Sequence, residues 1–516
     1  MTLKNRFDMK FLNLKHIALI ALFPLLFSCV EKVNPEPSPN DQPGKETPEP
    51  PVVSKPSAEI QQADQFAQNL LGTYYLWTKE INSDIAKLTP DTCKSPIPVV
   101  KEIRYHQGGK EVDHWTELMS DLSSMTSSVQ GLGLSFGYDL MSGAISNKQG
   151  CYFLIVCYVN KGKPAEKAGL KRGDIIMTID GNDITASNIY DAFYAENVTL
   201  GIAHLTADGY LGPVEKTVSM TADKVWEDPV LVNKTFDVGG KKVGYLAYSA
   251  FDLNSSTTLP DVFRKFKSEG IEELIIDLRY NGGGYAFTEC LLASMIAPSS
   301  NVAAGDVFQT EVYNSILADA WKQQNYDTNT YLSTKHVYKD STHDIDEDVS
   351  DANPGIKKLY AIVTKGSASA SEGLIVGLSP YVDITLIGQQ TYGKYCAGLM
   401  MSPEDLYGTN SPYDYSKITK WGMYVMVSKF ADKNGDNAAQ PDGIPVQIES
   451  KDNPLDGSQL GDENETMLRA ALTAAGKVYT RSSVETGRQF ETELLEHSVP
   501  RGILIKTDIP QVVNNF

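Results

Sequence analysis

Short apolar runs that end at glycine-rich turns recur in the second half of the chain and predict buried strands. Residues 274–279 and 359–364 are such runs, and each turn leads into an apolar helix, at 287–296 and 374–378. A further run, at 384–387, again ends at a glycine. Strands that alternate with helices in this way are typical of an α/β fold.

The first half of the chain follows different patterns. Residues 35–56 contain 8 prolines in 22 positions, which predicts an extended tether that does not pack into a core. The spacing of the apolar residues Ile60, Phe66, Leu70, Leu71 and Tyr74 predicts an amphipathic helix between Ile60 and Trp77. We therefore expect a small helical region over 59–126, followed by an alternating strand at 152–159.

The N-terminus has the pattern of an export signal. Basic residues precede an apolar run of 11 residues at 17–27, about half of what a membrane-spanning helix needs. The run ends Leu26-Phe27-Ser28-Cys29, which resembles the lipobox of bacterial lipoproteins. That resemblance implies cleavage after residue 28 and lipidation of Cys29. Because Val30 follows, where an aspartate would indicate retention in the inner membrane, we expect the outer membrane.

Composition narrows the possible functions. The 516 residues allow about three domains. With 46 Lys and Arg against 65 Asp and Glu, the net charge is −19, which makes a nucleic-acid-binding protein improbable. Six cysteines are too few for a disulfide framework in a chain of this length.

The middle of the chain contains a glycine loop, Gly131-Leu132-Gly133-Leu134, followed by the string PAEKAGLKRGDIIMTIDG at 164–181. Together they closely resemble a PDZ domain, here expected over 127–223. The resemblance implies that the backbone amides of Leu132, Gly133 and Leu134 bind the C-terminal carboxylate of a peptide. The peptide itself would add a strand to the sheet edge.

Two turns in the second half have residues suited to acyl-transfer chemistry. Three glycines at 282–284 follow the first buried strand, and the second strand runs into the serine-rich turn 366–371. A strand-turn-helix with small residues exposes a serine at a helix N-terminus. There, the helix dipole and free amides stabilise a developing oxyanion.

The strings DLRYNGGG, TKGSASASE and IGQQTYGK, in this order after a PDZ domain, resemble the tail-specific or C-terminal processing serine peptidases, family S41. The resemblance implies an α/β core of the crotonase type, built from ββα repeats. It also implies Ser369 as the nucleophile and Lys394, 25 positions later, as the general base. The amides of Ala370 and Gly283 would form the oxyanion hole. Neither a metal nor a cofactor is implied.

A lysine base works only when it is neutral. At its ordinary pKa of about 10.4, holding it neutral at pH 7 costs about 4.6 kcal/mol. We therefore predict apolar walls around Lys394, with four candidates among its sequence neighbours: Leu386, Ile387, Leu399 and Met400. His114 is the alternative base, because some relatives use a histidine.

One position departs from the family pattern. A glutamine that orients the lysine usually follows it by four residues, whereas Gly398 stands there in this chain. Either another group orients Lys394, or the site has decayed and the protein is a non-catalytic PDZ-type binding lipoprotein. On the first view, Gly398→Gln is expected to raise activity if the backbone accepts the side chain.

The sequence thus predicts a lipid-anchored serine endopeptidase of the cell envelope. It would bind protein or peptide substrates by their free C-termini and the membrane through Cys29. The expected segments are a signal peptide at 1–28, a tether at 29–58, the helical region at 59–126, the PDZ domain at 127–223, the peptidase core at 224–480 and a C-terminal tail at 481–516.

Overall fold

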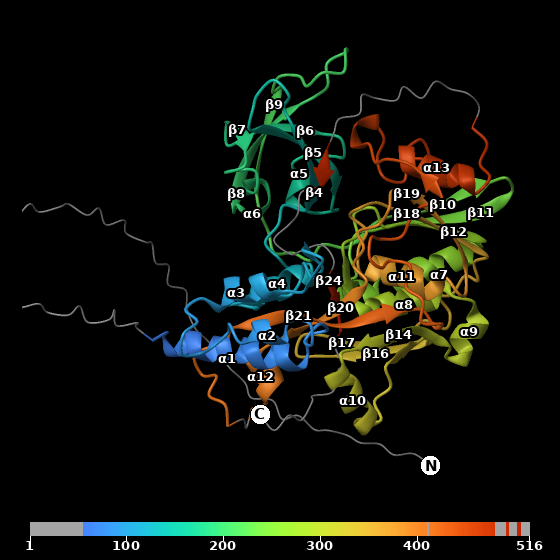
Figure 1. Cartoon of the computed structure of the whole chain (residues 1–516). Helices are drawn as coiled ribbons and strands as arrows, with labels where there is room; N and C mark the ends of the chain where they lie inside the picture. The colour runs from blue at the N-terminus through green and yellow to red at the C-terminus, as the bar shows by residue number, and fades with distance from the viewer. Residues whose placement is uncertain (1–54, 410–411, 480–491, 495–502, 507–516) are drawn as a thin grey trace, which may run out of the picture. The chain divides into compact units, whose positions relative to one another are not determined.

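A computed structural model describes residues 55–409, 412–479, 492–494 and 503–506 of the chain (Figure 1). The predicted signal peptide, Cys29 and nearly all of the tether lie outside the described residues. Within the described ranges, no helix is both long enough and apolar enough to cross a membrane.

The region before the predicted PDZ domain is built around helix α1, Ala58–Thr73. The helix begins at Ser57, whose side chain accepts a hydrogen bond from the Ile60 amide, and it buries Phe66 and Leu70. The predicted helix is confirmed, although it ends four residues before Trp77. The region also contains short strands. Its other elements are α2 (Asn82–Ile85), α3 (Pro96–Ile103), β1 (His106–Gln107), β2 (Lys110–Glu111), β3 (Glu117–Met119) and α4 (Ser123–Val129).

A seven-stranded sheet around the string at 164–181 forms its own apolar core, which includes the buried side chains of Leu154, Ile176 and Leu200. The strand order is β23-β4-β5-β7-β6-β8-β9. The elements are β4 (Tyr138–Ala144), β5 (Cys151–Val159), α5 (Pro164–Lys167), β6 (Ile175–Ile179), β7 (Asn182–Thr185), α6 (Asp191–Tyr194), β8 (Asn197–Ala203), β9 (Lys216–Thr221) and β23 (Glu493–Leu494).

The apolar runs of the second half form a six-stranded sheet in the order β10-β11-β12-β18-β19-β22. Strands β11, β12, β18 and β19 run parallel, as expected for strands joined through helices. The elements are β10 (Val230–Val238), β11 (Lys241–Tyr248), α7 (Leu259–Glu269), β12 (Glu273–Asp277), β18 (Lys358–Val363), α11 (Ala370–Leu378), β19 (Asp383–Gly388), β22 (Ile448–Glu449) and α13 (Thr466–Ala474).

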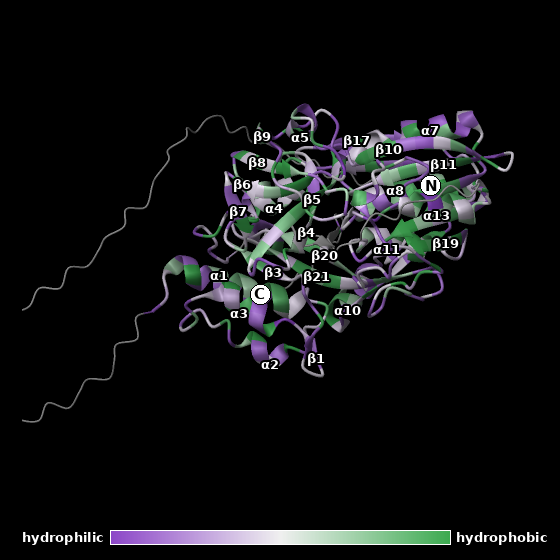
Figure 2. Ribbon diagram, turned by 90° about the horizontal axis from the view of Figure 1, so that it is seen from above, coloured by the Kyte–Doolittle hydropathy of each residue, from purple (hydrophilic) through white to green (hydrophobic). Residues whose placement is uncertain are grey.

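A second sheet of the core has the order β13-β24-β20-β21-β14-β15, and β3 of the N-terminal region pairs with β21. Strands β20 and β21 consist mostly of apolar residues (Figure 2). These sheets with their helices confirm the predicted α/β fold. The elements are β13 (Gly283–Tyr285), α8 (Ala286–Ile296), α9 (Ser299–Ala304), β14 (Val307–Tyr313), α10 (Ser315–Gln324), β15 (Asn329–Tyr331), β16 (Lys335–Lys339), β17 (Asp344–Asp348), β20 (Cys396–Met401), α12 (Pro403–Tyr407), β21 (Gly422–Ala431) and β24 (Ile503–Ile505).

Arg172, in the string at 164–181, takes part in a buried ion cluster with the core. Its guanidinium lies 2.6 Å from Asp452 and donates to the Tyr280 hydroxyl at 2.5 Å. Arg279 lies 2.9 Å from the same Asp452 and 2.6 Å from Glu465. The cluster therefore connects the sheet of β4–β9 to the residues just before the glycine turn.

Arg172→Ala is expected to lower the free energy of unfolding by about 3–5 kcal/mol, because Asp452 would lose a buried partner. Chemical denaturation measures this loss. Arg264→Ala, which removes a partly exposed pair with Asp351, is the matched control and should cost about 1 kcal/mol or less. Equal losses in the two variants would contradict a special role of the cluster.

Candidate active site

Ser369 stands between β18 and α11 in a strained backbone conformation. Its φ is +61° and its ψ is −111°, a combination that side-chain-bearing residues rarely adopt. The side chain is fully buried, and its hydroxyl has no hydrogen-bond partner among the described residues. The strand-turn-helix is as predicted, but the expectation of an exposed serine is wrong. The backbone is therefore strained at a residue whose hydroxyl makes no hydrogen bond to the described part of the chain.

The neighbouring serines of the turn have structural partners. Ser367 Oγ donates to the Leu278 carbonyl at 2.7 Å. Ser371 Oγ donates to the Asn281 carbonyl at 2.9 Å. Both hydroxyls therefore fix the turn against the segment after β12. Of these serines, Ser369 is the one whose hydroxyl is not engaged by the fold.

Lys394 lies in the loop between β19 and β20 and is fully buried. Its ammonium is 4.4 Å from the centroid of the Trp115 ring and donates to the Tyr424 hydroxyl at 3.3 Å. Burial lowers the pKa of Lys394 to about 8. The burial was predicted from the sequence, whereas the two aromatic groups were not, because they come from the N-terminal region and from β21.

Trp115 is held in place by a buried carboxylate. Asp113 accepts hydrogen bonds from the Trp115 amide at 2.9 Å and from the Tyr75 hydroxyl at 2.7 Å. The Thr116 hydroxyl accepts from the Met426 amide of β21 at 3.2 Å, so this segment is fixed to the core. The N-terminal region therefore supplies part of the environment of Lys394.

Glu372 joins the serine turn to the lysine loop, a role that the sequence analysis missed. One carboxylate oxygen accepts from the backbone amides of both Ser369 and Lys394, each at 2.9 Å. The other accepts from the Thr391 hydroxyl at 2.5 Å and the Gly393 amide at 2.7 Å. Burial raises the pKa of Glu372 to about 7. An acid in the first turn of the helix after the serine was the available signal.

Glu372→Gln is expected to reduce kcat by about 10²-fold, because the amide nitrogen of glutamine would face backbone donors and displace one of the two loops. It should also lower the free energy of unfolding by about 1–3 kcal/mol. Steady-state kinetics and chemical denaturation measure the two effects. A variant with unchanged kcat would contradict the positioning role of this carboxylate.

The glycine turn lies against the serine turn. The Asn281 carbonyl accepts from the Ala368 amide at 3.1 Å. Ala370 is the first residue of α11, so its amide has no acceptor within the helix. The Gly283 amide donates to Asn281 Oδ1 at 2.9 Å and would have to leave that acceptor to bind an oxyanion. The assignment of Ala370 and Gly283 as the oxyanion donors stays a prediction.

Position 398 has no space for the glutamine side chain that the family pattern suggested. A Cβ at this position would lie 2.5 Å from Met426 Cε and 2.6 Å from Tyr424 Cε2. The condition on which Gly398→Gln was expected to raise activity, that this position accepts a side chain, is therefore not met. The Tyr424 ring already occupies this space, and its hydroxyl accepts the hydrogen bond from Lys394.

Tyr424→Phe is expected to keep the ring but remove the acceptor of the lysine. The pKa of Lys394 should fall further, because a hydrogen bond to its charged form is lost. The rising limb of kcat/KM against pH should then move to lower pH, with a plateau reduced about threefold to tenfold. Tyr381→Phe, which removes a hydroxyl bonded to Val307, is the control. A profile identical to the wild type would contradict the contact.

His114 has a different environment from the buried pair. Its side chain is 48% exposed, and Nδ1 lies 3.1 Å from the Glu111 carboxylate. Ser369 and Lys394 are both fully buried. The structure therefore gives His114 the surroundings of a surface histidine, and its neighbour Trp115 is the residue that contacts Lys394.

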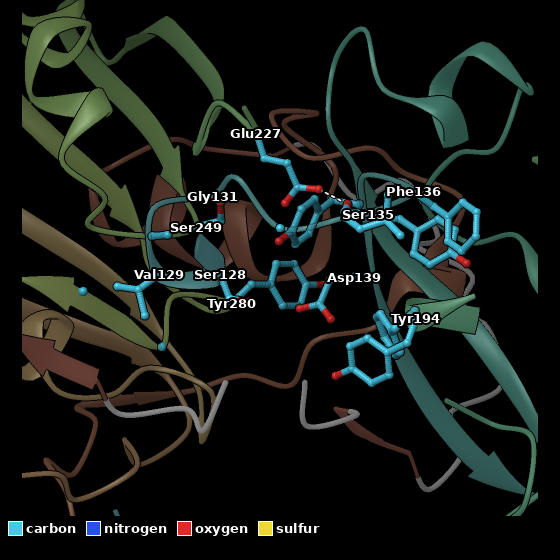
Figure 3. A pocket seen from close by; sticks show the side chains of 18 of the residues that line it. Ser128, Val129, Gly131, Ser135, Phe136, Asp139, Tyr194, Glu227, Ser249 and Tyr280 are labelled. Atoms are coloured by element: carbon cyan, nitrogen blue, oxygen red, sulfur yellow. Dashed lines mark hydrogen bonds between the residues drawn. The ribbon is translucent and has the colours of Figure 1, made fainter. Parts of the chain in front are cut away.

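A pocket of about 250 Å³ separates the PDZ glycine loop from the glycine turn of the core (Figure 3). Gly133 and Leu134 line it, whereas the Leu132 amide donates to the Ser127 carbonyl at 2.9 Å. Asp139 and Glu227 also line it, and Ser135 donates to Glu227. The carboxylate-binding role of Leu132, Gly133 and Leu134 stays a prediction, and the pocket gives it acidic surroundings.

Comparison with known families agrees with this geometry. Residues 242–450 match the model of peptidase family S41, and residues 155–203 match that of the PDZ domain. The match to peptidase family S41 covers most of the predicted core, and the match to the PDZ domain precedes it. The resemblance to S41 peptidases and to PDZ domains that was drawn from the sequence is therefore confirmed.

Curated proteins similar to this chain are named as C-terminal processing peptidases or proteases. One is the chloroplastic C-terminal processing peptidase of Tetradesmus obliquus, 27% identical over 54% of this chain and 53% of its own length. Another is the carboxy-terminal processing protease CtpB of Bacillus subtilis, 26% identical over 52% of this chain and 48% of its own. The chain thus spans about half the length of these relatives.

A solved structure from Bacteroides fragilis, assigned to the S41 proteases, shares the fold. It superposes with a TM-score of 0.61 at 23% identity, covering 80% of this chain and 96% of the other.

Proposed function

We propose that the protein is a serine endopeptidase that uses Ser369 as the nucleophile and Lys394 as the general base. The observation that carries the proposal is the Glu372 carboxylate, which holds the amides of both residues on one oxygen. A strained serine without a structural partner and a buried lysine with a lowered pKa are thereby fixed relative to each other. Nothing in this arrangement is needed for a binding protein.

In the proposed reaction, neutral Lys394 takes the proton of Ser369 as Oγ attacks the carbonyl carbon of the substrate. The Ala370 amide, at the N-terminus of α11, donates to the oxyanion that forms. Lys394 then returns the proton to the leaving amine, and water hydrolyses the acyl-enzyme. Burial keeps the pKa of Lys394 low enough for this role, and the rings of Trp115 and Tyr424 lie against its side-chain nitrogen.

Labelling with a serine-reactive fluorophosphonate tests the proposal directly. Ser369 should be the labelled residue, as shown by mass spectrometry of the peptides. Ser371→Ala is the matched control, because it removes a neighbouring hydroxyl that has a structural partner and should leave labelling in place. Absence of labelling in the folded wild type would favour the alternative, a non-catalytic PDZ-type binding protein.

The proposed substrates are proteins that the PDZ domain binds by an extended C-terminal segment. Gly133 and Leu134 line the pocket that leads towards the glycine turn, which supports this part of the proposal. Amidation of the terminal carboxylate should weaken binding of a peptide to the Ser369→Ala protein about tenfold or more. Unchanged affinity would remove the carboxylate from recognition without affecting the peptidase assignment.

The proposed location is the cell envelope, with a lipid anchor at Cys29. The support is the sequence at 26–29 and the proline-rich segment after it. Incorporation of labelled palmitate into the wild type, and its loss in Cys29→Ser, would be the expected result. Equal incorporation in both proteins would contradict this anchor.

A further inference from the structure

Two described pieces of the C-terminal tail form strands with separate parts of the molecule. β23 pairs antiparallel with β4, which would be the edge strand of the PDZ sheet without it, so that Leu494 lies opposite Met141. β24 pairs in parallel with β13, so that Ile503 lies opposite Gly283. The tail therefore follows the PDZ edge first and the strand after the glycine turn second.

The direction of the tail is that of a bound ligand. It runs antiparallel to β4, from Ser142 towards the end of the strand where Tyr138 and Asp139 line the pocket. Its second piece begins opposite Gly283, which lines the pocket from the core side. A peptide that binds a PDZ domain adds to the sheet edge in the same way.

β24 lies between the two halves of the candidate active site. On one side is β13, which begins at Gly283 within the glycine turn, and on the other is β20, which begins two residues after Lys394. The Lys506 amide donates to the Gly398 carbonyl of β20 at 3.0 Å. Ser369 and Lys394 are fully buried, so neither side chain is open to a substrate in this conformation.

We propose that residues 492–494 and 503–506 occupy the strand edges of β4, β13 and β20 to which an extended segment of a protein substrate binds. The tail then has to leave these edges before a substrate reaches Ser369. This inference rests on the proposed peptidase function. The ligand is recognised by backbone hydrogen bonds, because the pocket between the two edges has the acidic residues Asp139 and Glu227 and no basic residue in its lining.

The pairing that holds β24 in the sheet is short. β24 has three residues in parallel pairing, which is slightly less stable per residue than antiparallel pairing. The described side chains that anchor it are Ile505, which is 3% exposed, and Lys506, which forms an ion pair with Glu311. A single substitution at Lys506 can therefore weaken the attachment in the full chain.

Peptide binding to the catalytically inactive Ser369→Ala protein tests the occupancy without any need for turnover. A site-specific protease sequence is placed within residues 480–491 of the full chain and cut after folding. A fluorescent peptide of residues 492–506 should then bind at least about tenfold more tightly to the cut chain, because a tethered competitor acts at a roughly millimolar effective concentration. Equal affinity of the cut and uncut chains, or no binding to the cut chain, would overturn the proposal.

Lys506→Glu tests the consequence for activity, because it places a carboxylate beside Glu311. The kcat/KM for an unstructured protein substrate should rise at least about threefold, mainly through KM, as the tail yields the edges. Lys339→Glu, which reverses an exposed pair with Asp344, is the control and should change nothing. Lower activity with a lower melting temperature in Lys506→Glu alone would make β24 a closing strand of the sheet and overturn the proposal.

The two proposals fail separately. If no variant turns over substrate while the peptide binds the cut chain more tightly, the peptidase function fails and the occupancy of the edges stands. If turnover is normal and the peptide binds both chains equally, the occupancy fails and the peptidase function stands.

Discussion

Ser369→Ala is expected to reduce kcat for an unstructured protein substrate by at least about 10³-fold, because the nucleophile is removed while the substrate edges remain. The free energy of unfolding should stay within about 1 kcal/mol of the wild type. The hydroxyl is buried without a partner among the described residues, so its loss leaves no donor or acceptor unpaired. Single-turnover kinetics and chemical denaturation measure the two quantities.

Comparison with a variant of Ser367 tests whether Ser369 is the nucleophile. Ser367→Ala removes a hydroxyl that donates to the Leu278 carbonyl and should cost about 1–3 kcal/mol of stability while retaining turnover. Ser369→Ala should show the reverse pattern. If Ser367→Ala lost all turnover and Ser369→Ala kept it, the nucleophile would be Ser367 and the assignment of Ser369 would be wrong.

Local sequence patterns were sufficient for the elements around the serine. The run at 359–364 and the apolar helix after it correspond to β18 and α11, and small residues at the turn allowed the tight bend. The pattern did not reveal that Ser369 is buried. Burial depends on which segments cover the turn, and those come from distant parts of the chain.

The environment of Lys394 shows the limit of sequence neighbours most clearly. Four apolar residues near it in sequence were expected to form its walls, whereas the groups found over the ammonium are Trp115 and Tyr424. Trp115 reaches the site because its segment is fixed to β21. Trp115 and Lys394 are about 280 residues apart in the sequence, so no local periodicity predicts their contact. The same holds for β24, whose three residues give no readable alternation.

Packing accounts for the glycine at the position where the family pattern has a glutamine. At position 398 a side chain would collide with the Tyr424 ring, so glycine and tyrosine fit each other across β20 and β21. Loss of one motif residue is therefore no argument for an inert site when a residue of the neighbouring strand fills its space. The sequence pattern, taken alone, left those two interpretations open.

The pH dependence of activity is expected to follow the protonation of Lys394. Burial holds its pKa at about 8, so about one molecule in ten has the neutral base at pH 7 and half have it at pH 8. The cost of neutralising the base at pH 7 falls from about 4.6 to about 1.4 kcal/mol. The kcat/KM of the wild type should therefore rise about tenfold between pH 6 and 7 and reach a plateau above pH 9.

Substitutions at Lys394 separate its chemical role from its structural cost. Lys394→Arg should be inactive, because a guanidinium does not lose its proton near neutral pH. Lys394→Met should be equally inactive, yet more stable at pH 7 by up to about 3 kcal/mol, since a charge buried without full compensation is removed.

The folded wild type binds the proton of Lys394 less tightly than the unfolded chain does. The free energy of unfolding of the wild type should therefore increase from pH 8 to 10.5. A flat activity profile from pH 5 to 9 that survives Lys394→Met would remove lysine from the mechanism and return His114 as the base.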